Sequence, residues 1–316
     1  MPEKEPKKKL LLIAKSAVAA GLIGLLIWQV DWSRMWGEFA KASIPFLLVA
    51  TVLYGFGVEL CVRRWWRTSQ YKGFSMTLGN AREHFYAGLF LNNFLPSFLG
   101  GDAYQSYILG KSEKRYAAAF STVMFVRFMG LFVTIILFLL FGVIGFREVF
   151  SQDLFAAFGI FLTVFLVVDA FFFYARRHLQ NVFKFLPEKI RNVFGEIGGY
   201  TDMRFFRDTF IVSVVFAVVG VGLFNMTIFW ALGTPVPIVP YLSVVFLISI
   251  ISSLPVSVNN IGLKEWAYYA FLPLIGIRPE TALAVALLGR FLQILVSLAG
   301  APSFFREKKE YGIEGE

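Results

Sequence analysis

The 316-residue chain is predicted to be an all-α, polytopic integral membrane protein with one membrane domain over residues 1–316. Hydrophobic residues make up 57% of the chain, whereas soluble domains have roughly 45–50% apolar residues. Apolar runs of membrane-spanning length recur along the sequence. Aromatic residues reach 18%, which suits contact with lipid and with the membrane interface.

Six segments are predicted to cross the membrane as full helices. Each is close to the length that traverses ~30 Å of hydrocarbon at ~1.5 Å per residue. The segments are 10–30, 44–62, 117–141, 154–174, 208–232 and 279–304. The first follows a basic N-terminus, as in a signal peptide, but its apolar run exceeds the ~7–15 residues of a signal-peptide core. We therefore expect it to be retained as a membrane helix.

Two further apolar segments, 74–110 and 239–278, are interrupted near their middle. The interrupting residues are Pro96, Gly100 and Gly101 in LPSFLGGD, and Pro255 and Gly262 in LPVSVNNIGLKE. Proline lacks a backbone N–H and ends a helix, whereas glycine permits positive φ and close backbone approach. Each segment is expected to enter and leave on one side of the membrane, as a re-entrant helical hairpin.

The basic residues predict the orientation of the chain. Most of its 30 Lys and Arg residues fall at 4–9, 63–72, 111–115 and 176–207 and in the C-terminal tail. Because basic loops stay in the cytoplasm, both termini are expected there, with the chain in the cell (inner) membrane. The linker 176–207 is predicted to form an amphipathic cytoplasmic helix, which either lies on the lipid interface or packs on a hairpin.

The order helix, helix, broken hairpin, helix occurs twice, in residues 10–141 and 154–304. Since the first copy starts in the cytoplasm and the second outside, the two are predicted to form an inverted-topology repeat. Broken backbone at membrane depth must be buried in protein or line a wet cavity. In transporters, paired interruptions in inverted halves indicate a substrate site near the midplane.

Two arginines, Arg127 and Arg290, lie about ten residues into their predicted helices, near the bilayer centre. A charge there costs ~2.5–3.5 kcal/mol and is usually functional or paired. Because a guanidinium binds phosphate bidentately, both are expected to face a lipid phosphate. Alternatively, they pair with Asp102 and Glu265 for structure alone. These carboxylates could also cap a half-helix or carry a coupling proton.

Other candidate substrate-binding residues are polar side chains beside the breaks. They are Asn92, Asn93, Asn259, Asn260 and Lys264. The asparagines offer amides to a headgroup or to freed backbone groups, or simply form turns. No catalytic residue, metal site or cofactor is predicted, because nucleophile, phosphate-loop and metal-ligand motifs are absent. Glu59 is expected to pair with Arg63, four residues further on.

Four motifs, NNFLPSFLGGDAY, FVRFMG, SLPVSVNNIGLKEW and LLGRFLQ, occur in this order. They resemble the transmembrane region of lysylphosphatidylglycerol synthases, which stand-alone flippase-like proteins share. The resemblance covers about residues 10–304 and implies a part in moving lipid between leaflets, here without the synthetase domain, since the chain stops at Glu316. The matching positions are Pro96, Gly100, Gly101, Asp102, Arg127, Pro255, Gly262, Glu265 and Arg290.

The chain departs from the family pattern at four positions. Arginine is common in the family where Gln105 and Lys264 stand, and glycine where Asn259 and Asn260 stand. These departures bear on which headgroup is recognised.

The sequence therefore predicts a transporter that moves an anionic phospholipid, an aminoacyl-phospholipid or a lipid-linked glycan carrier between leaflets. The alternative is a membrane component of a lipid-headgroup-modifying or glycosyltransferase system, as an enzyme subunit or as a scaffold for a partner synthase or glycosyltransferase. Membrane lipids are the expected partners. Nucleic acid is not, because the basic residues are divided among juxtamembrane loops.

Overall fold

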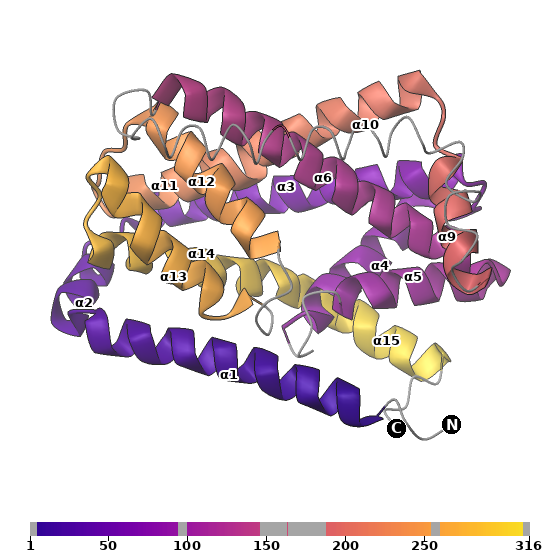
Figure 1. Ribbon diagram of the computed structural model, residues 1–316, viewed down its shortest axis with the longest axis horizontal. Coiled ribbons are helices and arrows are strands. Elements are labelled where there is room, and N and C mark those ends of the chain that lie inside the picture. The colour runs from indigo at the N-terminus through magenta and orange to yellow at the C-terminus, as the bar shows by residue number, and fades with distance from the viewer. Residues whose placement is uncertain (1–4, 94–99, 146–162, 164–187, 254–259, 312–316) are drawn as a thin grey trace.

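The computed structural model describes residues 5–93, 100–145, 163, 188–253 and 260–311. Within these ranges every regular element is a helix (Figure 1), which confirms the predicted all-α class. The elements are α1 (Glu5–Gln29), α2 (Trp32–Ala40), α3 (Ile44–Tyr71), α4 (Leu78–Leu91), α5 (Gly100–Glu113), α6 (Tyr116–Gly145), α9 (Glu188–Gly198), α10 (Met203–Val215), the π-helix η2 (Phe216–Leu223), α11 (Phe224–Ala231), α12 (Ile238–Ser253), α13 (Leu263–Phe271), the 3₁₀-helix η4 (Leu272–Ile275), α14 (Pro279–Ser297), the 3₁₀-helix η5 (Leu298–Gly300) and α15 (Ala301–Tyr311).

Long apolar helices make the chain a polytopic membrane protein. Four stretches of the described chain are long and apolar enough to cross a membrane: Ile44–Tyr71, Tyr116–Gly145, Met203–Ala231 and Pro279–Arg306. The predicted spans 44–62, 117–141, 208–232 and 279–304 correspond to them. Helices α1 and α2 meet at a bend of 87° and form a fifth, broken candidate. The predicted span 154–174 lies outside the described residues, apart from Thr163.

The two predicted broken segments consist of short helices. Helices α4 and α5 have 14 residues each, α12 has 16 and α13 has 9. At ~1.5 Å per residue none reaches the ~30 Å of a hydrocarbon core. Within each segment the two helices contact each other. The expected breaks at Pro96 and Pro255 lie outside the described residues.

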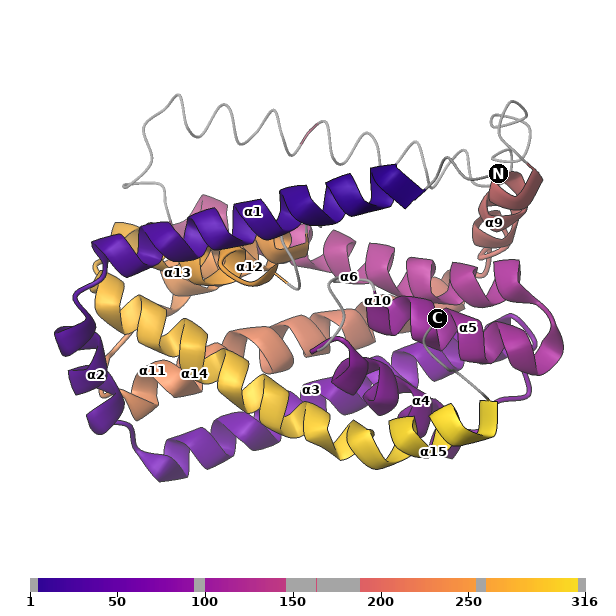
Figure 2. The same cartoon turned by 90° about the horizontal axis from the view of Figure 1, so that it is seen from below.

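Long helices from different parts of the chain pack along one another. Helix α6 lies against α12, and α3 lies against η2 and α11 (Figure 1). Helix α14 continues through η5 into α15 and packs across α4 (Figure 2). The approach of α3 to η2 is close, because a Cβ added at Gly57 would lie 2.9 Å from the Cα of Gly220. Small residues are therefore required at this crossing.

At one end of the molecule, polar contacts join the ends of α3, α5 and α9. Lys72 Nζ lies 2.9 Å from Glu196 Oε2, and Arg115 Nη2 donates to the Lys72 carbonyl at 2.9 Å. The start of α1 and the end of α15 lie at the same end (Figure 1). The described part of the predicted linker 176–207 is residues 188–207, which contain α9 and the start of α10; α9 packs on α6.

Helix α3 extends to Tyr71, beyond the predicted end at residue 62. The prediction that Glu59 pairs with Arg63 was wrong. Its carboxylate instead receives a two-pronged contact from Arg82 of α4, with Nε–Oε1 of 2.7 Å and Nη2–Oε2 of 2.9 Å. A guanidinium that donates to both oxygens of a carboxylate binds it more strongly than a typical contact between residues four apart on one helix, such as Glu59 and Arg63.

Candidate functional site

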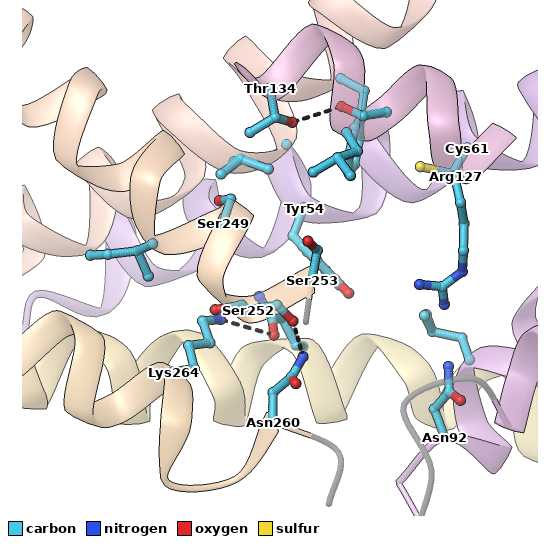
Figure 3. A pocket seen from close by; sticks show the side chains of 18 of the residues that line it. Tyr54, Cys61, Asn92, Arg127, Thr134, Ser249, Ser252, Ser253, Asn260 and Lys264 are labelled. Atoms are coloured by element: carbon cyan, nitrogen blue, oxygen red, sulfur yellow. Dashed lines mark hydrogen bonds between the residues drawn. The ribbon is translucent and has the colours of Figure 1, made fainter. Parts of the chain in front are cut away.

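A cavity of about 750 Å³ lies among α3, α6, η2, α12, α13 and α14. Arg127 and Asn92 lie on one side of it, and Lys264 and Asn260 on the other (Figure 3). Its described lining also includes Arg64 and Arg290, but no aspartate or glutamate. Apolar side chains of α6, η2 and α12 complete the walls. This combination of cations, amides and apolar surface suits an amphipathic anion.

An arginine–carboxylate pair occurs twice with the same spacing. Asp102 is the third residue of α5 and pairs with Arg127, the twelfth residue of α6. Glu265 is the third residue of α13 and pairs with Arg290, the twelfth residue of α14. Each pair is separated by 25 residues along the chain. The structure therefore shows the pairing alternative, and both arginines also line the cavity.

The second pair also closes the N-terminus of α13. Arg290 Nε donates to Glu265 Oε1 at 2.5 Å, and the Gly262 N–H donates to Glu265 Oε2 at 2.9 Å. Arg290 Nη2 also donates to the carbonyl of Asn260 at 3.1 Å. Gly262 has a φ of 81°, a conformation that favours glycine. One carboxylate therefore fixes both the arginine and the start of the helix.

In the first broken segment an amide, rather than a carboxylate, accepts the backbone N–H at the start of the second helix. Asn92 Oδ1 accepts the backbone N–H of Gly101 at 2.6 Å, so it satisfies a donor freed at the start of α5. Gly100 and Gly101 begin α5 without positive φ, contrary to expectation. Gly101 instead permits close approach, since a Cβ there would collide with the carbonyl of Gly88. Asn93 Nδ2 donates to Ser297 Oγ at 2.6 Å.

The other polar candidates lie at the opposite wall. Lys264 Nζ is 3.4 Å from Gln293 Oε1 and 6.0 Å from the centroid of the Tyr268 ring. Asn260 Nδ2 donates to the carbonyl of Ser252, the last-but-one residue of α12. Asn259 lies outside the described residues.

Sequence reasoning missed Arg64, which it placed in the cytoplasmic basic cluster 63–72. The side chain lines the cavity, and the residue is only 7% exposed. Only the continuation of helical periodicity beyond residue 62 could have indicated this, since α3 turns Arg64 inward and leaves Arg63 and Arg67 exposed. Asn225 was also missed. It lines the cavity and accepts from the Tyr268 hydroxyl at 2.7 Å.

Comparison with known proteins identifies the family. The family model of the lysylphosphatidylglycerol synthase TM region matches residues 12–300. The chain belongs to this family. UPF0104 membrane protein PH1989 of Pyrococcus horikoshii is 22% identical over 339 residues, which cover 96% of this chain and 98% of that protein. No solved structure matches the chain.

The motifs that carried the family resemblance supply the two ion pairs. Asp102 and Arg127 come from the first two motifs, and Glu265 and Arg290 from the last two. Asn260 and Lys264, two of the positions at which the sequence was expected to depart from the family pattern, line the cavity.

Proposed function

We propose that this member of the lysylphosphatidylglycerol synthase TM-region family moves lipids with anionic headgroups between the leaflets of the cell membrane. One observation carries the proposal: a cavity of about 750 Å³ among apolar helices, with arginine and lysine side chains on its walls. A charged group leaves water only where other charges or hydrogen-bond donors replace its hydration. The cavity offers such groups to a lipid phosphate.

The architecture under this proposal is an inverted repeat with two re-entrant hairpins, α4–α5 and α12–α13. Two observations support it. These helices are too short to span a membrane alone, and the carboxylate–arginine pair recurs at the same place in each half. The hairpins enter from opposite faces, and the end that carries the basic clusters and both termini faces the cytoplasm.

During transport the headgroup enters the cavity while the acyl chains stay in lipid. Arg127 and Arg290 hold the starts of α5 and α13 through Asp102 and Glu265, and they contact the headgroup from the cavity walls. Donors beside the two hairpin breaks are added by Asn92, Asn93, Asn260 and Lys264. Alternate opening toward each face, by movement of one hairpin at a time, then delivers the headgroup to the other leaflet.

The test is lipid translocation in proteoliposomes. Fluorescent phosphatidylglycerol is reduced from outside by dithionite, so protein that translocates lipid exposes the inner-leaflet pool. We expect wild-type protein to expose that pool faster than protein-free liposomes do. Ser249→Trp, which fills the cavity, should slow the rate to that of empty liposomes. The matched control Val52→Trp, at a position 70% exposed on α3, should leave it unchanged. Equal rates for wild-type protein and empty liposomes would refute the proposal.

A further inference from the structure

Arg64 is a buried cation on the cavity wall. Its Nη1 donates to Ser213 Oγ at 2.8 Å, and its guanidinium carbon lies 5.6 Å from the centroid of the Phe216 ring. Nη2 is 3.9 Å from the sulfur of Cys61. In the described part of the chain, no carboxylate lies within ion-pair distance of Arg64, and its Nε has no hydrogen-bond partner. A buried charge with only neutral neighbours requires a balancing anion.

Two cations of the cavity lining, Arg64 and Lys264, form no ion pair with a described carboxylate. Arg127 and Arg290 are neutralised by Asp102 and Glu265. Lys264 is held by an amide and a ring, and no ion pair joins it to a described carboxylate. Since the described lining contains no acidic residue, Arg64 and Lys264 give this described lining an excess of positive charge.

Arg64 and Lys264 come from different walls of the cavity. Lys264 belongs to α13, on the side of the cavity that also carries Asn260 (Figure 3). Arg64 belongs to α3 and lies beside Phe216, the first residue of the π-helix η2. Inserted π turns occur often at functional sites, because they displace a segment of helix from its regular path. An anion in the cavity is therefore attracted from both walls.

We propose that the cavity is selective for lipids whose headgroup carries a net negative charge, and that Arg64 and Lys264 enforce this selectivity. This inference rests on the proposed function, because it assigns to two side chains of the same cavity the discrimination between lipids by net headgroup charge. Of the three substrate classes left open by the sequence, it separates the aminoacyl-phospholipids from the anionic phospholipids and the lipid-linked glycan carriers. A phosphodiester or pyrophosphate headgroup is attracted, a zwitterionic headgroup gains little, and an aminoacylated headgroup with net positive charge is repelled.

The experiment measures lipid affinity of the purified full chain in a neutral detergent, by titration with dioctanoyl-phosphatidylglycerol and dioctanoyl-phosphatidylcholine. We expect wild-type protein to prefer phosphatidylglycerol by about tenfold or more. Arg64→Met should weaken phosphatidylglycerol binding by about tenfold and leave phosphatidylcholine binding nearly unchanged. Arg64→Lys should keep most of the preference because it keeps the charge. The control Arg207→Gln removes an exposed guanidinium and should match wild type.

Two further measurements keep the test decisive. The unfolding midpoint without lipid should be no lower in Arg64→Met than in wild type, because the substitution removes a buried cation that has no described carboxylate partner. Lys264→Met provides a second variant at the opposite wall and should also lose preference. Unchanged preference in folded Arg64→Met and Lys264→Met would overturn the inference, even if translocation is intact. Conversely, charge preference without translocation would leave the inference standing and refute the proposed transport.

Discussion

Removing Arg290 leaves a carboxylate with little exposure and without its cation. The side chain of Glu265 is 6% exposed and that of Arg290 is 21% exposed, with 2.5 Å between Oε1 and Nε. Breaking a buried pair costs about 3–5 kcal/mol. Because Arg290 partly faces the cavity, water replaces some of the interaction, so we expect Arg290→Gln to cost ~2–3 kcal/mol, below that range. Glu265→Gln should cost a similar amount, since it also loses the charged acceptor for the Gly262 N–H.

The double variant Glu265→Gln/Arg290→Gln measures how much of each single cost comes from the interaction between these two side chains. It leaves neither charge unbalanced, so its cost should fall below the sum of the single costs by ~1–3 kcal/mol. The assay is equilibrium unfolding in mixed micelles titrated with dodecyl sulfate, followed by the fluorescence of the seven tryptophans. Additive costs, or a single-variant cost under ~0.5 kcal/mol as for an exposed pair, would refute the reasoning.

Three further substitutions test other parts of the structure. Gly57→Ala should destabilise the protein by ~1–3 kcal/mol in the same unfolding assay, because its methyl group meets the backbone of Gly220. Gly262→Ala should cost ~1–2 kcal/mol, because φ is 81° there. The N–H and hydroxyl of Ser75 lower the pKa of the Glu113 carboxyl below its ordinary value of 4.5, so its stabilising effect is present above that pH and is lost as the pH falls through the lowered pKa. Glu113→Gln should therefore make the unfolding midpoint less sensitive to pH between neutrality and pH ~3.

Each of these predictions has a control. Gly55→Ala adds a methyl group on the same helix, where nothing lies within 4 Å, and should be neutral or stabilising. Gly262→Asn should cost less than Gly262→Ala, because asparagine tolerates positive φ better. Ser75→Ala removes only the hydroxyl donor to Glu113 and keeps the N–H donor, so it should reduce the pH dependence less than Glu113→Gln does. A loss in Gly55→Ala equal to that in Gly57→Ala would show that helix crossing is not the cause.

Features that depend only on residues close together in the chain were predicted from the sequence. Apolar run length identified the helices that contain 44–62 and 117–141, and the residues around Gly101 and Gly262 marked the interruptions. The alternative that Arg127 and Arg290 pair with carboxylates also came from sequence, because a charge at membrane depth requires a partner. These predictions needed only the neighbouring residues and the low polarity of the membrane.

The partner of Glu59 and the position of Arg64 could not be predicted, because they depend on contacts between segments that are distant in the chain. Glu59 binds Arg82 rather than Arg63, because the packing of α4 on α3 brings a better placed guanidinium. Arg64 looked like part of a cytoplasmic cluster, yet its hydroxyl partner Ser213 is 149 residues away along the chain. Composition assigns such a residue to a loop, whereas tertiary packing places it on the cavity wall.

The most direct measurement is an electron cryo-microscopy structure of the wild-type chain in nanodiscs that contain phosphatidylglycerol. The account predicts a headgroup density inside the cavity, with phosphate oxygens ~2.7–2.9 Å from the Arg64 guanidinium or the Lys264 amine. Lipid density confined to the outer surface, with only water beside Arg64 and Lys264, would contradict it.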